Sequence, residues 1–174
     1  MPTTTSGAGF LRARLEPLRE CIRAGSNDYC FVERQAILAE ADRRIDAVPA
    51  EFRYAFTLER LLTDLSTPIE PGDVFVGRMV EGPPGKEGPL LGGLPFFSSP
   101  GHTTLDWPLF LEEGLESVAK RGRRRAIELG SRQSGIFANN VERCCGAVIG
   151  FSRRYARAAR EAAQKAEGAQ REHL

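Results

Sequence analysis

The last forty residues of the chain form one long amphipathic pattern, which constrains the fold more than any other stretch. Apolar side chains recur mostly every three or four residues from Phe137 to Ala163, and arginines such as Arg153 and Arg157 lie between them. Alanines make the second half of this stretch slender and strongly helical. The pattern predicts a helix over residues 136–167 that packs against other helices along its length.

Shorter stretches with the same periodicity predict four more helices. They are expected at residues 10–24, 29–48, 50–65 and 104–119, after a disordered tail at residues 1–9. The apolar pattern of the second helix consists of Phe31, Ile37, Leu38, Ala41 and Ile45, and that of the third of Phe52, Phe56, Leu61, Leu62 and Leu65. Asp28 and Thr104 are the expected N-caps of the second and fourth helices, Pro49 ends the second, and Gly122 mildly interrupts the pattern after the fourth. The core face of the fourth helix is predicted to consist of Leu109, Leu111, Leu115 and Val118.

The middle of the chain has a different composition. Val74, Phe75 and Val76 predict a short strand within residues 73–80, with room for a second one. Five prolines and several glycines then occupy residues 82–102, which predicts a long loop that is functional or lies over a larger body. We therefore expect a mainly α fold over residues 10–174, in which helices surround one or two short β-strands and a long Pro/Gly loop.

Charge and cysteine usage exclude several classes of function. The 24 Lys and Arg residues nearly cancel the 23 Asp and Glu residues, so the net charge does not favour nucleic acid or an anionic membrane. No apolar run reaches the roughly 20 residues of a membrane span, and the N-terminus lacks the pattern of a signal peptide. The four cysteines follow neither a zinc spacing nor a disulfide pattern, so we expect free thiols and a cytoplasmic protein.

Three features invite a chemical interpretation. Cys144 and Cys145 could form a nucleophile or radical pair, but neighbours on an amphipathic helix point about 100° apart, which favours packing thiols. His102 is a candidate for binding a ligand or for organising the loop around it. The basic residues at 120–125 lack interleaved aromatic side chains, so a nucleic-acid site there is a weaker alternative to a solvated helix end. Spacing predicts no catalytic, cofactor or metal site.

Several segments, in this order along the chain, resemble the N-terminal part of the glycyl radical enzymes, the pyruvate formate-lyase superfamily. They are Glu33-Arg34, Arg53-Tyr54-Ala55 leading to Leu61-Leu62, the turn and strand from Pro68 to Arg78, the element from Gly101 to Trp107 with Glu113-Gly114-Leu115 after it, and Arg154-Tyr155-Ala156 before an Ala-rich stretch. The resemblance covers about residues 10–174. It implies helices like those that surround the α/β barrel of these enzymes.

The resemblance also implies what this chain lacks. In the complete enzymes, an activase that uses S-adenosylmethionine installs a glycyl radical, which passes to a cysteine and then to substrate. Neither the cysteine loop nor the glycine loop is matched here, so no cofactor is expected in this chain, and it is expected to be inactive alone. Cys144 and Cys145 precede the Arg-Tyr-Ala element, whereas the cysteine pair of the family follows it.

These observations lead to two hypotheses about function. In the first, the chain is an N-terminal fragment of an enzyme of anaerobic metabolism, a lyase or transferase that cleaves C–C or C–X bonds by a radical route. In the second, it is a non-enzymatic helical protein that oligomerises or binds a partner. The expected partner is accordingly a missing C-terminal catalytic portion, or a second copy bound through uncovered apolar helix faces.

Overall fold

The computed structural model describes residues 15–16, 19–20, 23, 28–69 and 106–166. Its elements are α2 (Asp28–Asp42), η1 (Ile45–Ala47), η2 (Ala50–Phe52), α3 (Arg53–Asp64), α4 (Trp107–Leu129) and α5 (Gln133–Lys165). This part of the chain is helical and contains no strand, which confirms the mainly α prediction. The five described residues within the predicted first helix, 10–24, are also helical. The predicted tail, strand and Pro/Gly loop lie outside the described residues.

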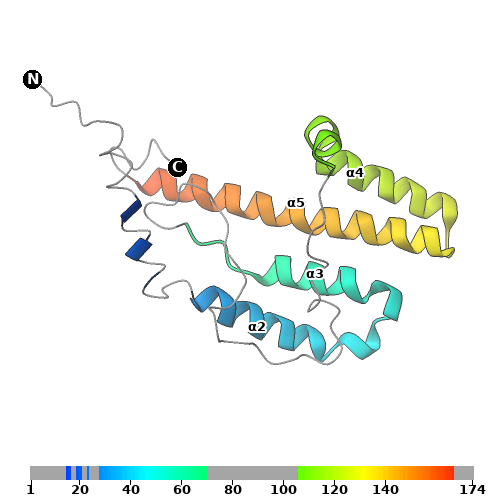
Figure 1. The fold of residues 1–174 in the computed structure, drawn as a ribbon, viewed down its shortest axis with the longest axis horizontal. Coiled ribbons are helices and arrows are strands. Elements are labelled where there is room, and N and C mark those ends of the chain that lie inside the picture. Colours follow the sequence, from blue (N-terminus) through cyan, green and yellow to red (C-terminus); the bar gives the residue numbers. More distant parts are fainter. Residues whose placement is uncertain (1–14, 17–18, 21–22, 24–27, 70–105, 167–174) are drawn as a thin grey trace, which may run out of the picture.

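The four long helices lie side by side in a row (Figure 1). α5 lies between α3 and α4, and α2 packs on the far side of α3. A short turn joins α4 to α5, so these two helices run antiparallel, as expected for helices joined by few residues. Among the described helices, α3 and α4 contact α5 from two opposite sides.

The buried core lies between α2 and α3. Its members are apolar residues of α2, of η1 and of the second half of α3: Leu38, Ala41, Ile45, Leu61 and Leu65. Phe151 of α5 packs against the edge of this cluster. The periodicity in the sequence predicted these positions correctly, because each of them repeats at the three- or four-residue spacing of one helix face.

The second helix ends earlier than predicted. The sequence predicted residues 29–48, whereas α2 ends at Asp42. The backbone N–H of Arg44 donates to the carbonyl of Ala41 at 3.1 Å, three residues back, and this tighter hydrogen bonding continues into the 3₁₀ turn η1. Helices often tighten to such bonds at their ends.

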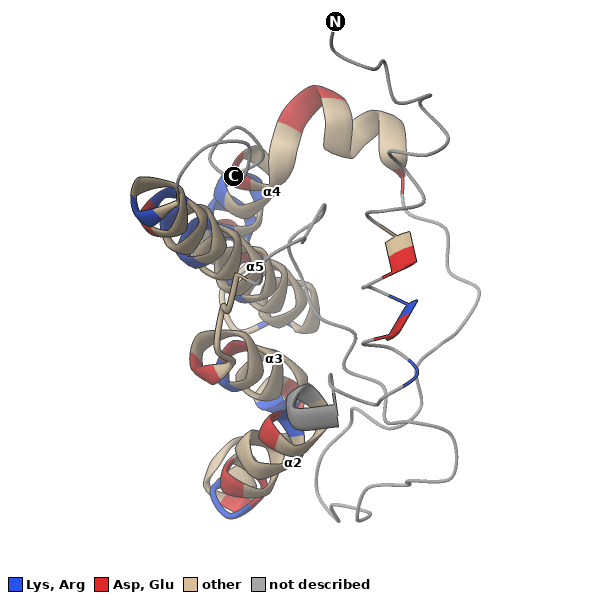
Figure 2. Cartoon of the chain, turned by 90° about the vertical axis from the view of Figure 1, so that its left-hand side faces the viewer, with Lys and Arg blue, Asp and Glu red and all other residues tan. Residues whose placement is uncertain are grey.

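α4 starts later than predicted and is bent. Its N-cap is Asp106 and not Thr104: the Asp106 carboxylate accepts a hydrogen bond from the backbone N–H of Leu109 at 3.2 Å. Gly114 has φ 72° and ψ 160°, a conformation that side chains disfavour, so the helix turns sharply there. The first part of α4 therefore extends away from α5, as Figure 2 shows.

Gly122 does not interrupt α4, and the prediction that it would was wrong. The helix continues through it to Leu129, and Gly122 is buried against α5. A Cβ atom at this position would lie 2.9 Å from the carbonyl oxygen of Ala138 and 3.1 Å from the backbone nitrogen of Glu142. The absence of a side chain therefore lets the two helix backbones approach closely.

Two residues predicted to be buried are exposed. Leu111, expected in the core face of α4, is 82% exposed because it lies on the part of the helix that bends away. Phe137, expected on the packed stripe of α5, is 70% exposed because α3 and α4 cover other faces of that helix. α5 itself begins at Gln133, three residues before the predicted start, and ends at Lys165.

Candidate functional site

The C-terminal end of α3 is held by a single arginine of α5. The Arg154 guanidinium donates to the carbonyl of Leu62 at 2.9 Å and also to the carbonyls of Thr63 and Leu65. The last carbonyls of a helix have no partner within the helix, and they carry the negative end of its dipole. A fixed cation with several N–H donors satisfies both needs. Arg154 therefore acts as a cap for α3 supplied from another helix.

A second side chain holds the residue that follows. The Glu33 carboxylate of α2 accepts two hydrogen bonds from Ser66, one from its backbone N–H and one from its hydroxyl, both at 2.9 Å. Arg154 and Glu33 thus fix the direction in which the chain leaves α3. We call this pair, together with the backbone from Leu62 to Ser66, the α3 junction.

Two aromatic side chains of α5 pack beside the α3 junction. The side chain of Tyr155 is 3% exposed, and its ring meets that of Phe151 edge to face, with the centroids 5.1 Å apart. The Arg154 guanidinium also lies 6.0 Å from the centroid of the Phe151 ring. These two neighbouring residues therefore have different roles. Arg154 reaches the end of α3, and Tyr155 buries its side chain and fixes α5 in the interior.

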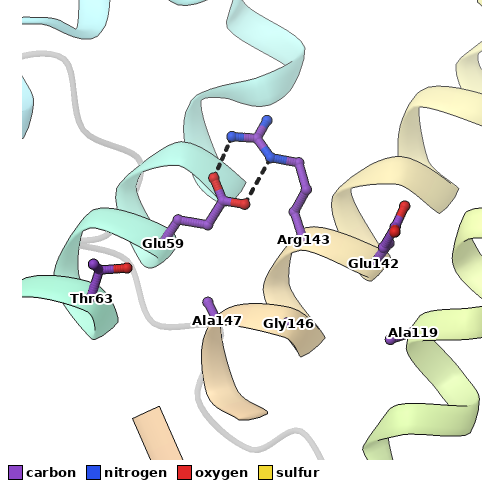
Figure 3. A pocket seen from close by; sticks show the side chains of 7 residues that line it. All are labelled: Glu59, Thr63, Ala119, Glu142, Arg143, Gly146 and Ala147. Carbon is purple, nitrogen blue, oxygen red and sulfur yellow. Dashed lines mark hydrogen bonds and ion pairs between the residues drawn. The ribbon is translucent and has the colours of Figure 1, made fainter. Parts of the chain in front are cut away.

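An open groove of about 690 Å³ lies over α5, between α3 and α4. Its lining, shown in Figure 3, consists of Glu59 and Thr63 from α3, Ala119 from α4, and Glu142, Arg143, Gly146 and Ala147 from α5. We call it the α5 groove. Its wall on the α3 side is an ion pair in which Arg143 Nε donates to Glu59 Oε1 at 3.0 Å and Arg143 Nη2 donates to the other carboxylate oxygen.

The charges in the α5 groove are not equivalent. The hydrogen bond that Arg143 donates to Glu59 raises the pKa of Arg143, so this guanidinium stays charged and is already paired. Glu142 is held less firmly, because its contact with Arg123 of α4 has a length of 3.8 Å. The groove therefore offers a carboxylate to an incoming cation, whereas an incoming anion would find its natural ligand, Arg143, paired with Glu59.

The two thiols of α5 lie near the groove but are poor nucleophiles. Cys144 and Cys145 are both half-buried free cysteines. Burial raises the pKa of both thiols, and the neighbouring Cys145 and then Glu59 raise that of Cys144 further. Neutral pH therefore leaves both thiols protonated, whereas nucleophilic and metal-binding cysteines need the thiolate. This environment fits packing residues.

The other candidates from the sequence contribute little to a site. His102 lies outside the described residues. The five basic residues within 120–125 are all exposed. Their arginines pair with glutamates of α4 and α5. Arg121, for example, contacts Glu113 at 2.6 Å across the bend at Gly114. Such pairing makes this a surface of mixed charge.

Within the ranges that the structure describes, no three His, Cys, Asp or Glu side chains lie close enough to hold a metal ion. The helices of the same ranges include none that is both long and apolar enough to cross a membrane.

Spacing in the sequence could not identify the residues that build these sites. Arg143 and Glu59 are 84 residues apart, and Arg154 is 92 residues from Leu62. The resemblance did single out Glu33 and Arg154, although it gave them no role. One sequence signal could have indicated a role for Arg154. It stands next to Tyr155, an aromatic residue on the apolar pattern of the same helix, and an arginine in such a place tends to find its polar partners on another element.

Comparison with known families gives one match. Residues 85–174, just over half of the chain, match the model of the family described as PFL-like, pyruvate formate lyase-like. The matched region contains α4, α5 and Arg154, while α2, α3 and Glu33 lie outside it. No curated protein and no solved structure matches the chain significantly.

Proposed function

This chain belongs to the pyruvate formate lyase-like family, and on that premise we propose that it is the helical N-terminal part of a glycyl radical enzyme-like protein. In this proposal, the radical chemistry belongs to a catalytic part that carries the cysteine and glycine loops. The complete protein would cleave C–C or C–X bonds, and this chain alone would be inactive.

The α3 junction is the observation that carries the proposal. Three of the segments on which the resemblance depends supply it: Glu33 from the first, Leu62 from the second, and Arg154 from the last. Residues far apart in the sequence thus serve one purpose, which is to fix where the chain leaves α3. The next segment of the resemblance, from Pro68 to Arg78, follows directly. The junction would thereby aim the predicted strand at residues 73–80 toward the barrel of the catalytic part.

Exposed apolar side chains support a large partner of this kind. Leu111 and Trp107, four residues apart on the projecting start of α4, are 82% and 56% exposed, and Phe137 of α5 is 70% exposed. Large exposed apolar residues that cluster on one element are typical of surfaces that another body covers. The even charge balance and the absence of a disulfide pattern fit a reducing cytoplasm as the proposed compartment.

In a glycyl radical enzyme, the glycine and cysteine loops supply hydrogen-atom abstraction when they are present. We do not assign that role to Cys144 or Cys145, because both are half-buried within the regular helix α5. What this chain contributes in the proposal is position: α5 and the α3 junction hold the start of a strand, and the projecting part of α4 offers apolar contacts.

Co-expression with a catalytic part tests the proposal. We expect the chain to purify as a stoichiometric complex with a separate polypeptide that carries the family's cysteine and glycine loops, with a mass measured by light scattering. An Arg154→Met variant should lose most of this complex, since the junction would no longer fix the predicted strand. An Arg124→Met variant, changed at an exposed arginine of α4, is the matched control and should behave as the wild type. Failure of the wild-type chain to form a complex would refute the proposal.

A further inference from the structure

We propose that the start of α4, residues Trp107–Glu113, is a hinged arm that closes onto the C-terminal half of α5 and buries its own apolar side chains there. We call these residues the α4 arm. The structure shows the arm in its open position, projecting from the helix row (Figure 2). Closing would hide the apolar surface assigned above to the catalytic part. Only that consequence rests on the proposed function, because the movement itself belongs to this chain alone.

Gly114 is the hinge between the α4 arm and the rest of α4. Its φ of 72° and ψ of 160° belong to a backbone region that is essentially restricted to glycine. A Cβ atom at this position would have no packed neighbour within 4 Å, so crowding does not explain the glycine. Glycine also adopts the angles of a regular helix. The same residue therefore permits a bent α4 and a straight one.

The apolar pattern of α4 continues across this hinge. Leu111, Leu115, Val118 and Gly122 follow one another at four, three and four residues, which is the spacing of one helix face. Gly122 is buried against α5, and Leu115 and Val118 are half-buried. Leu111, by contrast, is 82% exposed. Straightening of α4 at Gly114 would turn Leu111 toward α5 together with the rest of this face.

α5 offers a matching surface beyond the bend. The helix extends past the bend of α4 toward its own C-terminus, as Figure 1 shows. Ala156 lies eighteen residues after Ala138, the residue whose backbone packs against Gly122, and eighteen residues make five full helical turns. Ala156 therefore continues the face of α5 that α4 covers. It is exposed, and its small side chain leaves room for Leu111 of the closed arm.

Charged side chains specify the same register. Glu116, two residues after the hinge, contacts Arg153 of α5 at 2.5 Å. Because the two helices run antiparallel, one turn earlier on a straight α4 meets one turn later on α5, which places Glu112 against Arg157. Both of these side chains are exposed in the open form. Leu111 and Ala156 directly precede them in the sequence, so charge and apolar contact favour one position of the closed arm.

A different ion pair holds the arm open. Glu113 contacts Arg121 at 2.6 Å, although eight residues separate them in the sequence. Eight residues span about 12 Å along a straight helix, so this contact favours the bent form. Each position of the arm thus has an ion pair of its own. Ion pairs at the surface contribute little, and a partner that binds Leu111 and Trp107 would therefore select the open form.

Replacement of the hinge glycine tests the movement. Trp107 is the single tryptophan of the chain and is 56% exposed in the open form, so its fluorescence reports the position of the arm. Gly114→Ala disfavours the open hinge angles and should slow the quenching of Trp107 by acrylamide about threefold, with emission at shorter wavelength. The matched control is Gly150→Ala, at an exposed glycine of α5 that also has no neighbour within 4 Å. It should be quenched like the wild type.

Two arginine replacements should act in opposite directions. Arg157→Gln removes the partner that Glu112 finds in the closed form, so acrylamide should quench Trp107 about twofold faster. Arg121→Gln removes the partner of Glu113 in the open form, so quenching should slow by about as much. Both variants lose one positive charge, so each is the control for the other. Glu112→Arg combined with Arg157→Glu should restore the quenching of the wild type.

A cross-link tests the closed geometry directly. In a full chain whose four native cysteines are replaced by alanine, mild oxidation should join Leu111→Cys to Ala156→Cys within one molecule. Leu111→Cys with Ala163→Cys, seven residues farther along the same face of α5, is the control and should cross-link at least tenfold more slowly. Circular dichroism should show the same helix content for both chains.

The proposal is overturned if Gly114→Ala and the two arginine variants leave the quenching of Trp107 unchanged, or if the two cysteine pairs cross-link equally well or not at all. The catalytic part is absent from all these measurements. A permanently open arm would therefore refute the closing movement without refuting the proposed function.

Discussion

Arg154 is a charged side chain that connects two helices of the fold. It joins α5 to three carbonyls at the end of α3, and the contacts to Leu62 and Leu65 are partly buried. Hydrogen bonds to charged groups contribute about 1.5–3 kcal/mol each, and a carbonyl left without a partner costs about 1–3 kcal/mol. The values do not add, since water would replace part of the guanidinium.

Replacement of this guanidinium is therefore a sharp test at the scale of one residue. We expect Arg154→Met to lower the free energy of unfolding by about 2–4 kcal/mol, and Arg154→Lys to recover a minor part of the loss, because an ammonium cannot reach three carbonyls in the same fork geometry. Urea denaturation at low protein concentration measures both values.

The matched control for this experiment is Arg124→Met. Its guanidinium is exposed and contacts Glu128 at 3.8 Å, so the change should cost less than about 1 kcal/mol. Equal losses for Arg154→Met and Arg124→Met would show that the junction does not stabilise the fold.

The sequence did not predict individual roles such as that of Arg154. The resemblance pointed to Glu33 and Arg154 as residues. Arg154, however, binds backbone carbonyls that any sequence could supply, and Glu33 binds the backbone N–H and hydroxyl of Ser66, 33 residues away. Thiol chemistry is a contrasting case. The amphipathic pattern around Cys144 and Cys145 predicted packing residues, and their half-buried environment agrees with that role because burial raises their pKa.

At the scale of elements, three glycines of α4 and α5 have different roles, which the sequence does not distinguish. Gly114 bends α4, Gly122 lets α4 and α5 approach, and Gly146 faces open space. All three lie within helical patterns, so periodicity alone predicted a mild break at Gly122 and missed the real one at Gly114. Whether a glycine bends a helix or packs it depends on the neighbouring element, which local sequence does not specify.

Alanine replacement separates these roles. Gly122→Ala should lower the free energy of unfolding by about 1–3 kcal/mol, because the added Cβ would press on the backbone of α5. Gly146→Ala should raise it by up to about 1 kcal/mol, since alanine favours a helix and nothing lies within reach of its Cβ. Thermal or urea denaturation measures both at concentrations where the chain is monomeric. Effects of the same sign would contradict the assigned packing.

Helix periodicity predicted the elements of this part of the chain better than their ends. The core positions of α2 and α3 were correct because both helices bury one clear stripe. The ends depended on single hydrogen bonds, such as the cap at Asp106 and the tighter bond at Arg44. Exposed Leu111 was missed because the bend at Gly114 removes its turn of helix from the core.

At the scale of the whole molecule, α4, α5, α3 and α2 lie side by side in a row (Figure 1). One face of α5 carries the apolar pattern that the sequence predicted as buried, and the other carries the α5 groove. The sequence could predict that the apolar face needs a cover. It could not predict the groove, because residues of three helices build it and its ion pair joins α3 to α5.

The central proposal is that this member of the pyruvate formate lyase-like family positions a radical catalytic part. Electron paramagnetic resonance tests it most directly, on anaerobic samples treated with a radical S-adenosylmethionine activase. The complex of the chain with its catalytic part should show a glycyl radical signal, and the chain alone should show none. A protein radical on the isolated chain, or a correctly formed complex that never gains the signal, would contradict the claim.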